Sequence, residues 1–428
     1  MNPNKRKWYI VATMFIAIIC NYLDRQLLSI LKPEILDNFG IGNLEYAWIV
    51  NVFLICYATM YPISGMLVDK FGPKRVMLAG ITIWSLACIG GGMAPNATVF
   101  AICRGILGLA EPTIFAGQLI AVTMWFEKRQ RATANSLCTN GGSIGAVIAP
   151  VVIAWLMGYF DSWQYVFYIA GITGLVIALV WQFMYTTPPQ EILEKTVNAD
   201  KLSEGGKQQK SFTLGGLFKT KTLWGGILIR LISDPVWYFC CFWLPGFLRT
   251  MGETEGLSNE QTLNMIQWIG GIPFLIGAIG GILTSMWSDV LIRNGMEALK
   301  ARKKVLITMA FLAPVVALVP LVSGSAMPFA WRVGLVVALF CIIAVLCNSW
   351  LYTAPVTLVE QFPIKNAASV MGICCGAGAL GSVVFNQFVG SIPEAAWTIL
   401  FCCMGTLHLF AAIVMWKMVR PESPEKAK

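Results

Sequence analysis

Six charged residues interrupt stretches of the sequence that are otherwise apolar. They are Asp24, Arg25, Arg104, Glu111, Arg230 and Asp234. An isolated charge at the centre of a bilayer is costly, so such residues face a partner or a polar cavity. A guanidinium binds a carboxylate through parallel hydrogen bonds, and a carboxyl group in a low-dielectric site can carry a proton. The set therefore has the chemistry to bind an anion and to move a proton.

Two pairs of these charges lie on the first and fourth apolar stretches. Asp24 and Arg25 are adjacent, so on a helix they point about 100° apart and cannot both face the same point. One of them can face a central cavity while the other faces a neighbouring helix. Arg104 and Glu111 stand about two helical turns apart, so both project to one face and can pair or share a partner.

The third pair lies on the seventh apolar stretch. Arg230 and Asp234 are spaced i, i+4 and can pair with each other. Pro235 removes the hydrogen bond to the carbonyl of residue 231, so we expect a break in this helix. A paired kink and a ligand site are equally compatible with the pattern. Polar and aromatic side chains elsewhere on the apolar stretches could complete a pocket, and the candidates are Tyr22, Tyr57, Asn140, Trp237 and Trp350.

These residues stand in a sequence typical of a membrane protein. It is 57% hydrophobic and 12% charged, whereas a soluble domain is about 25% charged. Crossing a bilayer takes about 20 apolar residues, and twelve such stretches are present. They lie near 8–31, 45–68, 75–94, 97–124, 132–158, 164–186, 223–249, 264–287, 304–323, 331–356, 367–390 and 396–418. The predicted fold class is an all-α membrane protein with twelve transmembrane helices in two pseudo-symmetric bundles of six. We expect the first helix to be retained, since no signal-peptide cleavage site follows it.

The distribution of Lys and Arg predicts the orientation. With both termini placed in the cytoplasm, only Lys32, Arg249 and Arg332 fall in outer loops, and nearly all other bases fall in inner ones. This asymmetry follows the positive-inside rule. The net charge of +9 is explained by this topology, so no nucleic-acid partner is expected.

The longest polar stretch, 187–222, divides six apolar stretches from six others. GGSIGAVIAP at 141–150 resembles GAGALGSVVF at 376–385, which indicates a weak internal repeat. Repeated halves are typical of transporters that bind their substrate near the bilayer midplane. We therefore expect an N-terminal bundle at 1–186, a cytoplasmic linker at 187–222 and a C-terminal bundle at 223–428.

The loop after the second stretch carries a distinctive pattern. It contains Gly65, Asp69, Gly72 and Arg75 in the sequence GMLVDKFGPKR. The glycines allow a tight turn and close helix approach. Asp69 can accept hydrogen bonds from loop donors and pair with Lys74 or Arg75, which predicts a latch that a rocking motion could break. The spacing matches the G-x-x-x-D-x-x-G-x-[RK]-[RK] loop of the major facilitator superfamily.

Other chemistry is sparse. The 13 cysteines are scattered through apolar stretches, and His408 is the only histidine. No zinc-binding spacing and no nucleophile–base set is visible. We therefore expect no metal, no cofactor and no enzyme activity. A non-transporting sensor is a distant alternative, because the polar tails are too short for a signalling domain.

Over nearly its whole length the sequence resembles the anion:cation symporter family of that superfamily. The motifs that carry the resemblance are N-Y-L-D-R at 21–25, R-G-x-x-G-x-x-E at 104–111, W-F-x-x-x-x-R-x-x-A at 125–134 and S-D-x-L-I-R at 288–293. Within the family, hexuronate transporters are most similar, on SWQYVFYIAG at 162–171, SDPVWYFCCFWLP at 233–245 and FPIKNAASVMGICCGAGALG at 362–381.

The resemblance implies proton-coupled symport of an anionic sugar acid by alternating access. It implies that Arg25 holds the substrate carboxylate and that Asp24 and Glu111 carry protons. Arg104 would couple Glu111 to the substrate. The implied partners are a small sugar acid, protons and the lipid bilayer of the inner (plasma) membrane, and a monomer suffices.

The resemblance also bears on specificity. It implies that Tyr22 and Tyr57 lie beside the sugar acid. The galactonate type has a polar glutamine where this chain has Gly141 and Gly142. This departure argues against strict galactonate specificity and leaves Asn140 as the nearby polar candidate.

The nearest rival is an organophosphate:phosphate antiporter of the same superfamily. Arg25 and Arg230, on the first and seventh stretches, could clamp a phosphate. The internal partner Asp234 argues against this function, and Asp24 and Glu111 would serve no purpose in simple exchange.

Overall fold

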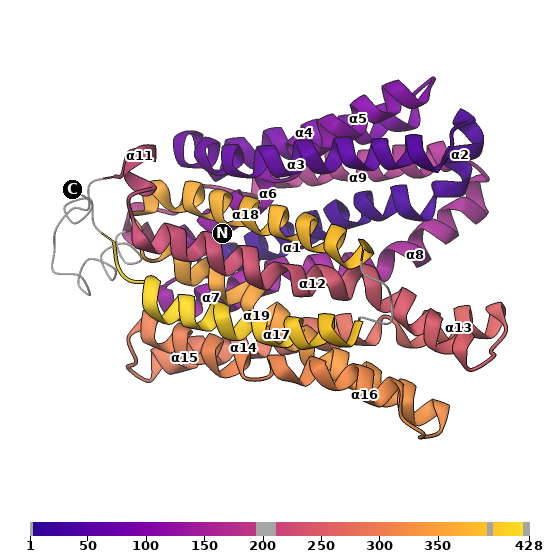
Figure 1. The fold of residues 1–428 in the computed structure, drawn as a ribbon. Coiled ribbons are helices and arrows are strands. Elements are labelled where there is room, and N and C mark those ends of the chain that lie inside the picture. The colour runs from indigo at the N-terminus through magenta and orange to yellow at the C-terminus, as the bar shows by residue number, and fades with distance from the viewer. Residues whose placement is uncertain (1–2, 194–210, 392–396, 423–428) are drawn as a thin grey trace. The chain divides into compact units, whose positions relative to one another are not determined.

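The protein is described by a computed structural model over residues 3–193, 211–391 and 397–422, and no strand occurs in these ranges (Figure 1). Most of the expected linker, residues 194–210, lies outside the described residues. Up to residue 193 the helices are α1 (Pro3–Ile30), α2 (Lys32–Phe39), α3 (Asn43–Phe71), α4 (Pro73–Gly92), α5 (Ala97–Ala110), α6 (Thr113–Trp125), α7 (Lys128–Thr139), α8 (Gly141–Phe160) and α9 (Trp163–Met184).

From residue 211 onward the described chain is again helical. Its helices are α11 (Leu214–Leu217), α12 (Lys221–Thr254), α13 (Asn259–Ile269), α14 (Ile272–Arg293), α15 (Ala298–Ala310), η1 (Ala313–Leu318), α16 (Val319–Ser323), α17 (Phe329–Val359), α18 (Ile364–Ser391) and α19 (Trp397–Met418). Within the described ranges, ten helical segments are long and apolar enough to cross a membrane, and the bent pair Lys128–Ala149 and Val151–Phe160 makes up to eleven. The 34-residue α12 covers the expected seventh span.

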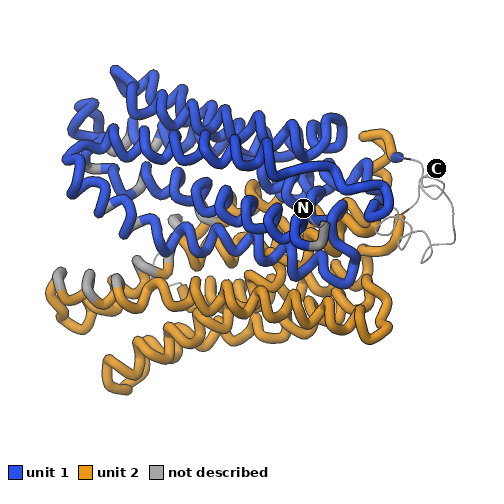
Figure 2. The backbone as a smooth tube through the Cα atoms, turned by 180° about the vertical axis from the view of Figure 1, so that it is seen from behind, with its two compact units in different colours: residues 1–211, 362–376 blue, residues 212–361, 377–428 orange. Residues whose placement is uncertain are grey.

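The chain forms two compact units, which Figure 2 colours separately. Unit 1 comprises Met1–Ser211 and Phe362–Gly376, and unit 2 comprises Phe212–Gln361 and Ala377–Lys428. The continuous helix α18 therefore contributes its first half to unit 1 and its second half to unit 2. The sequence-based boundaries at 186 and 223 remain a prediction.

Inside unit 1, small residues bring helices close together. α1 packs along α8, α3 along α5 and α4 along α9. A Cβ added at Gly141 of α8 would lie 2.5 Å from the Phe15 carbonyl oxygen of α1, and one at Gly145 would lie 2.8 Å from that of Ile19. Membrane helices approach closely where such small residues meet. The run of glycines in α8 therefore fixes the distance between α8 and α1.

The structure corrects one prediction about helix breaks. The expected break at Pro235 is absent, because α12 runs without interruption from Lys221 to Thr254. The Leu231 carbonyl that Pro235 cannot bond is covered by α18, where a Cβ on Gly381 would lie 2.5 Å from that oxygen. An unforeseen break occurs instead in the fourth span, where α5 ends at Ala110 and α6 begins at Thr113, after Pro112. Tertiary packing decides which proline interrupts its helix.

Candidate functional site

The central contact of unit 1 is an ion pair between α1 and the end of α5. The Arg25 Nε atom donates a hydrogen bond of 2.7 Å to Glu111 Oε2. The Glu111 side chain is fully buried, whereas 21% of the Arg25 side chain is exposed. The sequence placed Glu111 on the same face as Arg104, but its close partner in the structure is Arg25. The contact crosses helices, so spacing along one helix could not reveal it.

Aromatic rings surround the Arg25 guanidinium. Its Cζ atom lies 4.5 Å from the Tyr57 ring centroid and 5.0 Å from that of Tyr22. Phe53 and Phe115 complete the set at 5.9 Å each. A cation over ring faces is held by the ring quadrupole. Tyr22 and Tyr57 were predicted at this site, whereas the two phenylalanines were not, since no local signal separates them from lipid-facing aromatics.

The second arginine, Arg104, anchors the neighbouring part of α1. Its Nη1 atom donates to the backbone carbonyl of Asp24 at 3.3 Å, and its Cζ atom lies 5.3 Å from the Phe53 ring centroid. The Asp24 side chain points elsewhere, where its Oδ1 accepts a long contact of 3.8 Å from Cys88 Sγ. Asp24 and Arg25 therefore do not pair with each other, as their adjacency predicts.

Several buried polar atoms of this cluster have unused hydrogen-bonding capacity. Within the described part of the chain, no hydrogen-bond partner is found for Asp24 Oδ2, Arg25 Nη2, Arg104 Nε or Glu111 Oε1. A buried polar group without a partner is destabilising and needs a reason. In this cluster the free capacity consists of two cationic donors and two carboxyl oxygens, a set that can receive an acid and a proton.

Glycines on α5 bring Arg104 to this place. A Cβ on Gly108 would lie 2.5 Å from the Phe53 carbonyl oxygen, and one on Gly105 would lie 3.0 Å from Val52 Cγ1. α5 thus packs tightly against α3 on its glycine face. The turn at Pro112 ends α5 with Glu111 as its C-cap residue. The motif R-G-x-x-G-x-x-E therefore supplies both charges and the close approach that positions them.

The two predicted features of the fifth span also meet α1. A Cβ on Gly142 would lie 2.6 Å from the Tyr22 ring, so the ring occupies the space a side chain would need. Asn140 is 7% exposed and stands at the junction of α7 and α8. Gly142 therefore fixes the ring that covers one side of Arg25.

The loop between α3 and α4 contacts α18 rather than its own basic residues. Asp69 accepts hydrogen bonds from the backbone N–H groups of Ala368, at 3.0 Å, and Ser369, at 2.8 Å, and from the Ser369 hydroxyl. A Cβ on Gly65 would clash with the Ala368 carbonyl oxygen, and Gly72 adopts a left-handed φ of +79° at the turn.

The expected pairing of Asp69 with Lys74 or Arg75 is wrong. Both carboxylate oxygens of Asp69 accept hydrogen bonds near the start of α18, where the positive end of the helix dipole attracts an anion. Arg75 is exposed at the start of α4. The partners of Asp69 lie far away in the sequence, beyond the reach of local spacing.

The remaining predicted residues belong to unit 2. Arg230 Nη2 and Asp234 Oδ2 form the expected i, i+4 ion pair at 3.0 Å. Trp237 is 9% exposed and packs edge-on against Phe274, at 5.7 Å between ring centroids. Trp350 is 1% exposed and contacts the buried His408 ring at 5.6 Å. Within unit 2, both tryptophans are packed against other rings.

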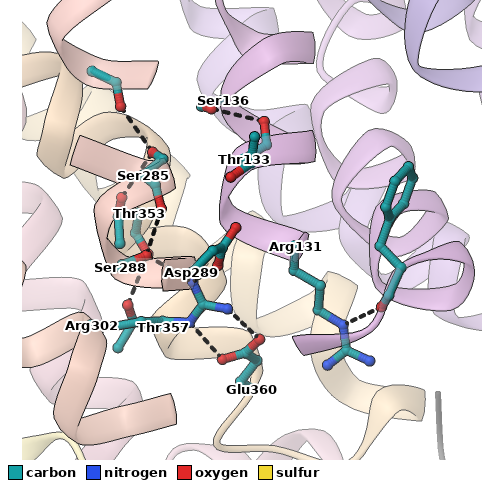
Figure 3. Close-up of polar contacts among 12 residues, drawn as sticks. Arg131, Thr133, Ser136, Ser285, Ser288, Asp289, Arg302, Thr353, Thr357 and Glu360 are labelled. Atoms are coloured by element: carbon teal, nitrogen blue, oxygen red, sulfur yellow. Dashed lines mark hydrogen bonds and ion pairs between the residues drawn. The ribbon is translucent and has the colours of Figure 1, made fainter. Parts of the chain in front are cut away.

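Sequence reasoning missed a buried network in unit 2, which Figure 3 shows. Arg302 of α15 donates to both oxygens of Glu360 at 2.9 Å each and to Asp289 Oδ1 at 3.4 Å. The Arg302 side chain is fully buried. Asp289 was recognised as part of the S-D-x-L-I-R motif, but Arg302 was counted as a loop base. Arg302 lies in the basic run 300–304, and nothing in that run distinguishes a buried arginine from an exposed one.

Arg131 of unit 1 was likewise counted as a loop base and is buried (Figure 3). It donates to the carbonyl oxygens of Phe126, at 2.9 Å, and Thr123, at 3.1 Å. These carbonyls lie at the end of α6, where helical partners run out. Arg131 therefore closes the end of a helix, and its charge meets the negative end of the helix dipole.

The charge cluster combines two arginines with two carboxyl groups. Over the residues that the structure describes, no group of three His, Cys, Asp or Glu side chains comes together as a metal site. Two arginines and two carboxyl groups next to tyrosine rings can exchange ion-pair partners within a buried, aromatic site. The cluster lies on helices that are long and apolar enough to cross a membrane.

The chain belongs to the Major Facilitator Superfamily, whose family model matches residues 14–384. It is a multi-pass membrane protein with the twelve-helix, two-bundle fold of that superfamily, as predicted from its sequence. Among solved structures it is similar to the proton:xylose symporter XylE bound to 6-bromo-6-deoxy-D-glucose, with a TM-score of 0.72, 14% identity and coverage of 99% of this chain and 98% of that chain.

Two curated relatives narrow the class. The chain is 25% identical to the hexuronate transporter of Escherichia coli (strain K12), over 97% of this chain and 94% of that protein. It is 28% identical to the galacturonate transporter of Dickeya chrysanthemi, over 65% of this chain and 80% of that protein. The protein is therefore a transporter of the superfamily related to carriers of hexuronates and other sugar acids.

Proposed function

We propose that this protein moves an anionic sugar acid of the hexuronate type together with protons, by alternating access. The observation that carries the proposal is the buried ion pair between Arg25 and Glu111. The names of its relatives supply the substrate class, since they are transporters of hexuronate and galacturonate. The geometry of unit 1 supports the proposed coupling.

Arg25 is the proposed ligand of the substrate carboxylate. Its guanidinium uses Nε for Glu111, while Nη2 has no hydrogen-bond partner among the described residues. A planar guanidinium is suited to a carboxylate, because it can form two parallel hydrogen bonds. Tyr22 and Tyr57 lie over the same group and would offer ring faces and hydroxyls to a sugar.

Glu111 is the proposed proton carrier that couples to the substrate. Its carboxylate and the substrate carboxylate would compete for one guanidinium. When Glu111 takes a proton it loses its charge and no longer holds Arg25, which then binds the anion. Asp24, buried beside the Arg104-bound turn of α1, is the proposed second carrier. Release of the proton on the far side would return Glu111 to Arg25 and expel the substrate.

The other predicted residues take supporting roles in this proposal. Asn140, Trp237 and Trp350 would complete the pocket. Asp69, with Gly65, Gly72 and Arg75, would form the gating loop, and its hydrogen bonds to Ala368 and Ser369 would break and re-form during each cycle. The bundle limits 1–186 and 223–428, a monomeric state and an inner-membrane location with both termini in the cytoplasm belong to the same proposal.

The test is uptake of D-glucuronate into proteoliposomes under an imposed inward proton gradient. Wild-type protein should accumulate substrate and alkalinise the medium. Glu111→Gln cannot lose a proton, so we expect gradient-driven accumulation to stop while exchange of substrate for substrate continues. Glu127→Gln is the matched control, because the Glu127 side chain is 43% exposed and pairs with the exposed Arg129.

Two outcomes would contradict the proposal. Accumulation against a gradient by Glu111→Gln would remove Glu111 from the coupling. Uptake that requires internal phosphate and leaves the pH of the medium unchanged would favour the organophosphate antiporter. The ion pair of Arg230 with Asp234 speaks against that alternative, because it occupies the second arginine that such a clamp needs.

A further inference from the structure

Unit 1 carries an apolar groove outside the charge cluster. A cavity of about 480 Å³ lies between α3, α4 and α5, with Met60 and Leu67 on one wall and Ile83 and Leu109 on the others. Ile83 is 47% exposed and Leu109 is 42% exposed, so the groove opens on the outer surface of the protein. Its volume falls within the range of about 300–1,000 Å³ usual for ligand pockets.

One end of the groove is positively charged. Arg75 is the only charged residue that lines it. Its neighbours Lys70 and Lys74 add two further charges on the same turn between α3 and α4. The nearby acid, Asp69, accepts hydrogen bonds from α18 and offsets one of these three charges, so this end stays net positive. The groove therefore joins a cationic end to an apolar body.

The dimensions of the groove fit one leaflet of a membrane. From Met60 to Phe71 its α3 wall is about 16 Å long, at about 1.5 Å per residue. The hydrocarbon core of a bilayer is about 30 Å thick, so a leaflet is about half of that. The cationic end lies at the turn between two spanning helices, at the depth of lipid headgroups.

We propose that this groove binds an anionic phospholipid, with one acyl chain along α3, α4 and α5 and the phosphate at Arg75. A zwitterionic lipid would bind more weakly, because it has no net charge to interact with the three cations.

The test measures lipid retention by native mass spectrometry after delipidated protein is exposed to equal amounts of phosphatidylglycerol and phosphatidylcholine. We expect wild-type protein to retain phosphatidylglycerol about fivefold more than phosphatidylcholine, the effect of one cation at a membrane surface. Ala79→Phe fills the groove and should abolish retention of both lipids. Arg75→Gln should reduce the preference, because only Lys70 and Lys74 remain at that end, and should leave weak retention.

Matched controls separate the site from general effects. Arg293→Gln removes an exposed arginine after α14, and Ile172→Phe enlarges an exposed residue of α9, outside the groove. Both should behave as wild type, and thermal unfolding in the same detergent verifies that every variant is folded. Equal retention of the two lipids by wild type would overturn the proposal. So would retention by folded Ala79→Phe equal to that of Ile172→Phe, or a dimer that Ala79→Phe dissociates.

Discussion

Two buried arginines, one in each unit, meet carboxylates in different ways. Arg302 in unit 2 is fully buried and binds both oxygens of Glu360 as well as Asp289. Arg25 in unit 1 keeps 21% of its side chain exposed and makes one hydrogen bond to Glu111, with a free Nη2 among the described atoms. A guanidinium whose donors are occupied by two carboxylates has no donor left for a ligand. A guanidinium that makes one hydrogen bond to a carboxylate still has donors for a ligand.

The groups around the two guanidinium groups also differ. Around Arg302 the neighbours are hydroxyls and carboxylates, such as Ser288, that hold a fixed geometry (Figure 3). Around Arg25 they are ring faces of Tyr22 and Tyr57, which stabilise a cation without fixing its hydrogen bonds. Under the proposed function, the Arg302 pair holds helices together and the Arg25 pair changes partners during transport.

The largest effect is expected when the saturated network is broken. Arg302→Ala would leave Asp289 and Glu360 buried without their cation, and loss of one partner of a buried pair costs about 3–5 kcal/mol. We expect a large fall in the thermal unfolding temperature, while the substrate affinity of the folded fraction stays that of wild type. Thermal unfolding in detergent measures the first quantity, and equilibrium binding of D-glucuronate measures the second.

Arg293→Ala is the control, since that arginine is exposed at the end of α14. A stable Arg302→Ala variant that had lost substrate binding would reverse the comparison, because Arg302 would then act as a ligand.

The next largest effect is expected at Arg25, whose guanidinium makes one hydrogen bond to Glu111. Arg25→Ala should weaken binding of D-glucuronate by about a hundredfold or more, since truncation of a buried charge partner costs about 2–5 kcal/mol. Arg25→Lys keeps the charge but loses the fork, so binding should remain weak. Calorimetric titration of purified protein gives both affinities. Unchanged affinity in folded Arg25→Ala would mean that the carboxylate binds elsewhere.

A smaller effect is expected at the ring that covers Arg25. Gly142→Ala adds a Cβ at 2.6 Å from the Tyr22 ring, so the ring must move away from the guanidinium. We expect the affinity for D-glucuronate to fall about tenfold, within the usual 1–3 kcal/mol for overpacking. Gly158→Ala, at a site on α8 with no atom near the new Cβ, should have no effect. Equal behaviour of the two variants would show that Tyr22 is not part of the pocket.

Apolar stretches and the loop motif were sufficient to predict an all-α membrane protein with the superfamily fold, because both are visible in single segments of the sequence. Partners across helices were not predictable. The same Glu111 has Arg104 two turns away on its own span, yet it bonds Arg25 of another helix. Asp69 finds Ser369 about three hundred residues away. Such contacts depend on how helices pack, which spacing along one helix does not determine.

The positions of helix breaks and the burial of arginines near helix ends also could not be predicted from local sequence. Pro235 leaves α12 intact because Gly381 of α18 packs against the carbonyl it frees, while Pro112 divides its span. Arg131 and Arg302 stand in basic runs that read as solvent-exposed loops, although both are buried. The sign of a charge is visible in the sequence, whereas its solvent exposure is decided by the helices that cover it.

The smallest effect is expected at the ion pair of Arg230 with Asp234. Its variants test whether this pair is structural, like that of Arg302, or changes partners, as proposed for Arg25. Arg230 and Asp234 satisfy each other within one turn of α12, and Gly378 leaves Asp234 little room, since a Cβ there would lie 2.0 Å from its Oδ2. Replacing a buried ion pair by apolar residues of similar volume is often neutral. The double variant Arg230→Met/Asp234→Leu should therefore keep the free energy of unfolding within about 1 kcal/mol of wild type and transport D-glucuronate normally. The single variant Asp234→Leu, which strands a buried cation, should be the less stable of the two. Loss of transport in a folded double variant would place Arg230 with Arg25 among the residues that change partners, and would revive the two-arginine clamp of a phosphate antiporter.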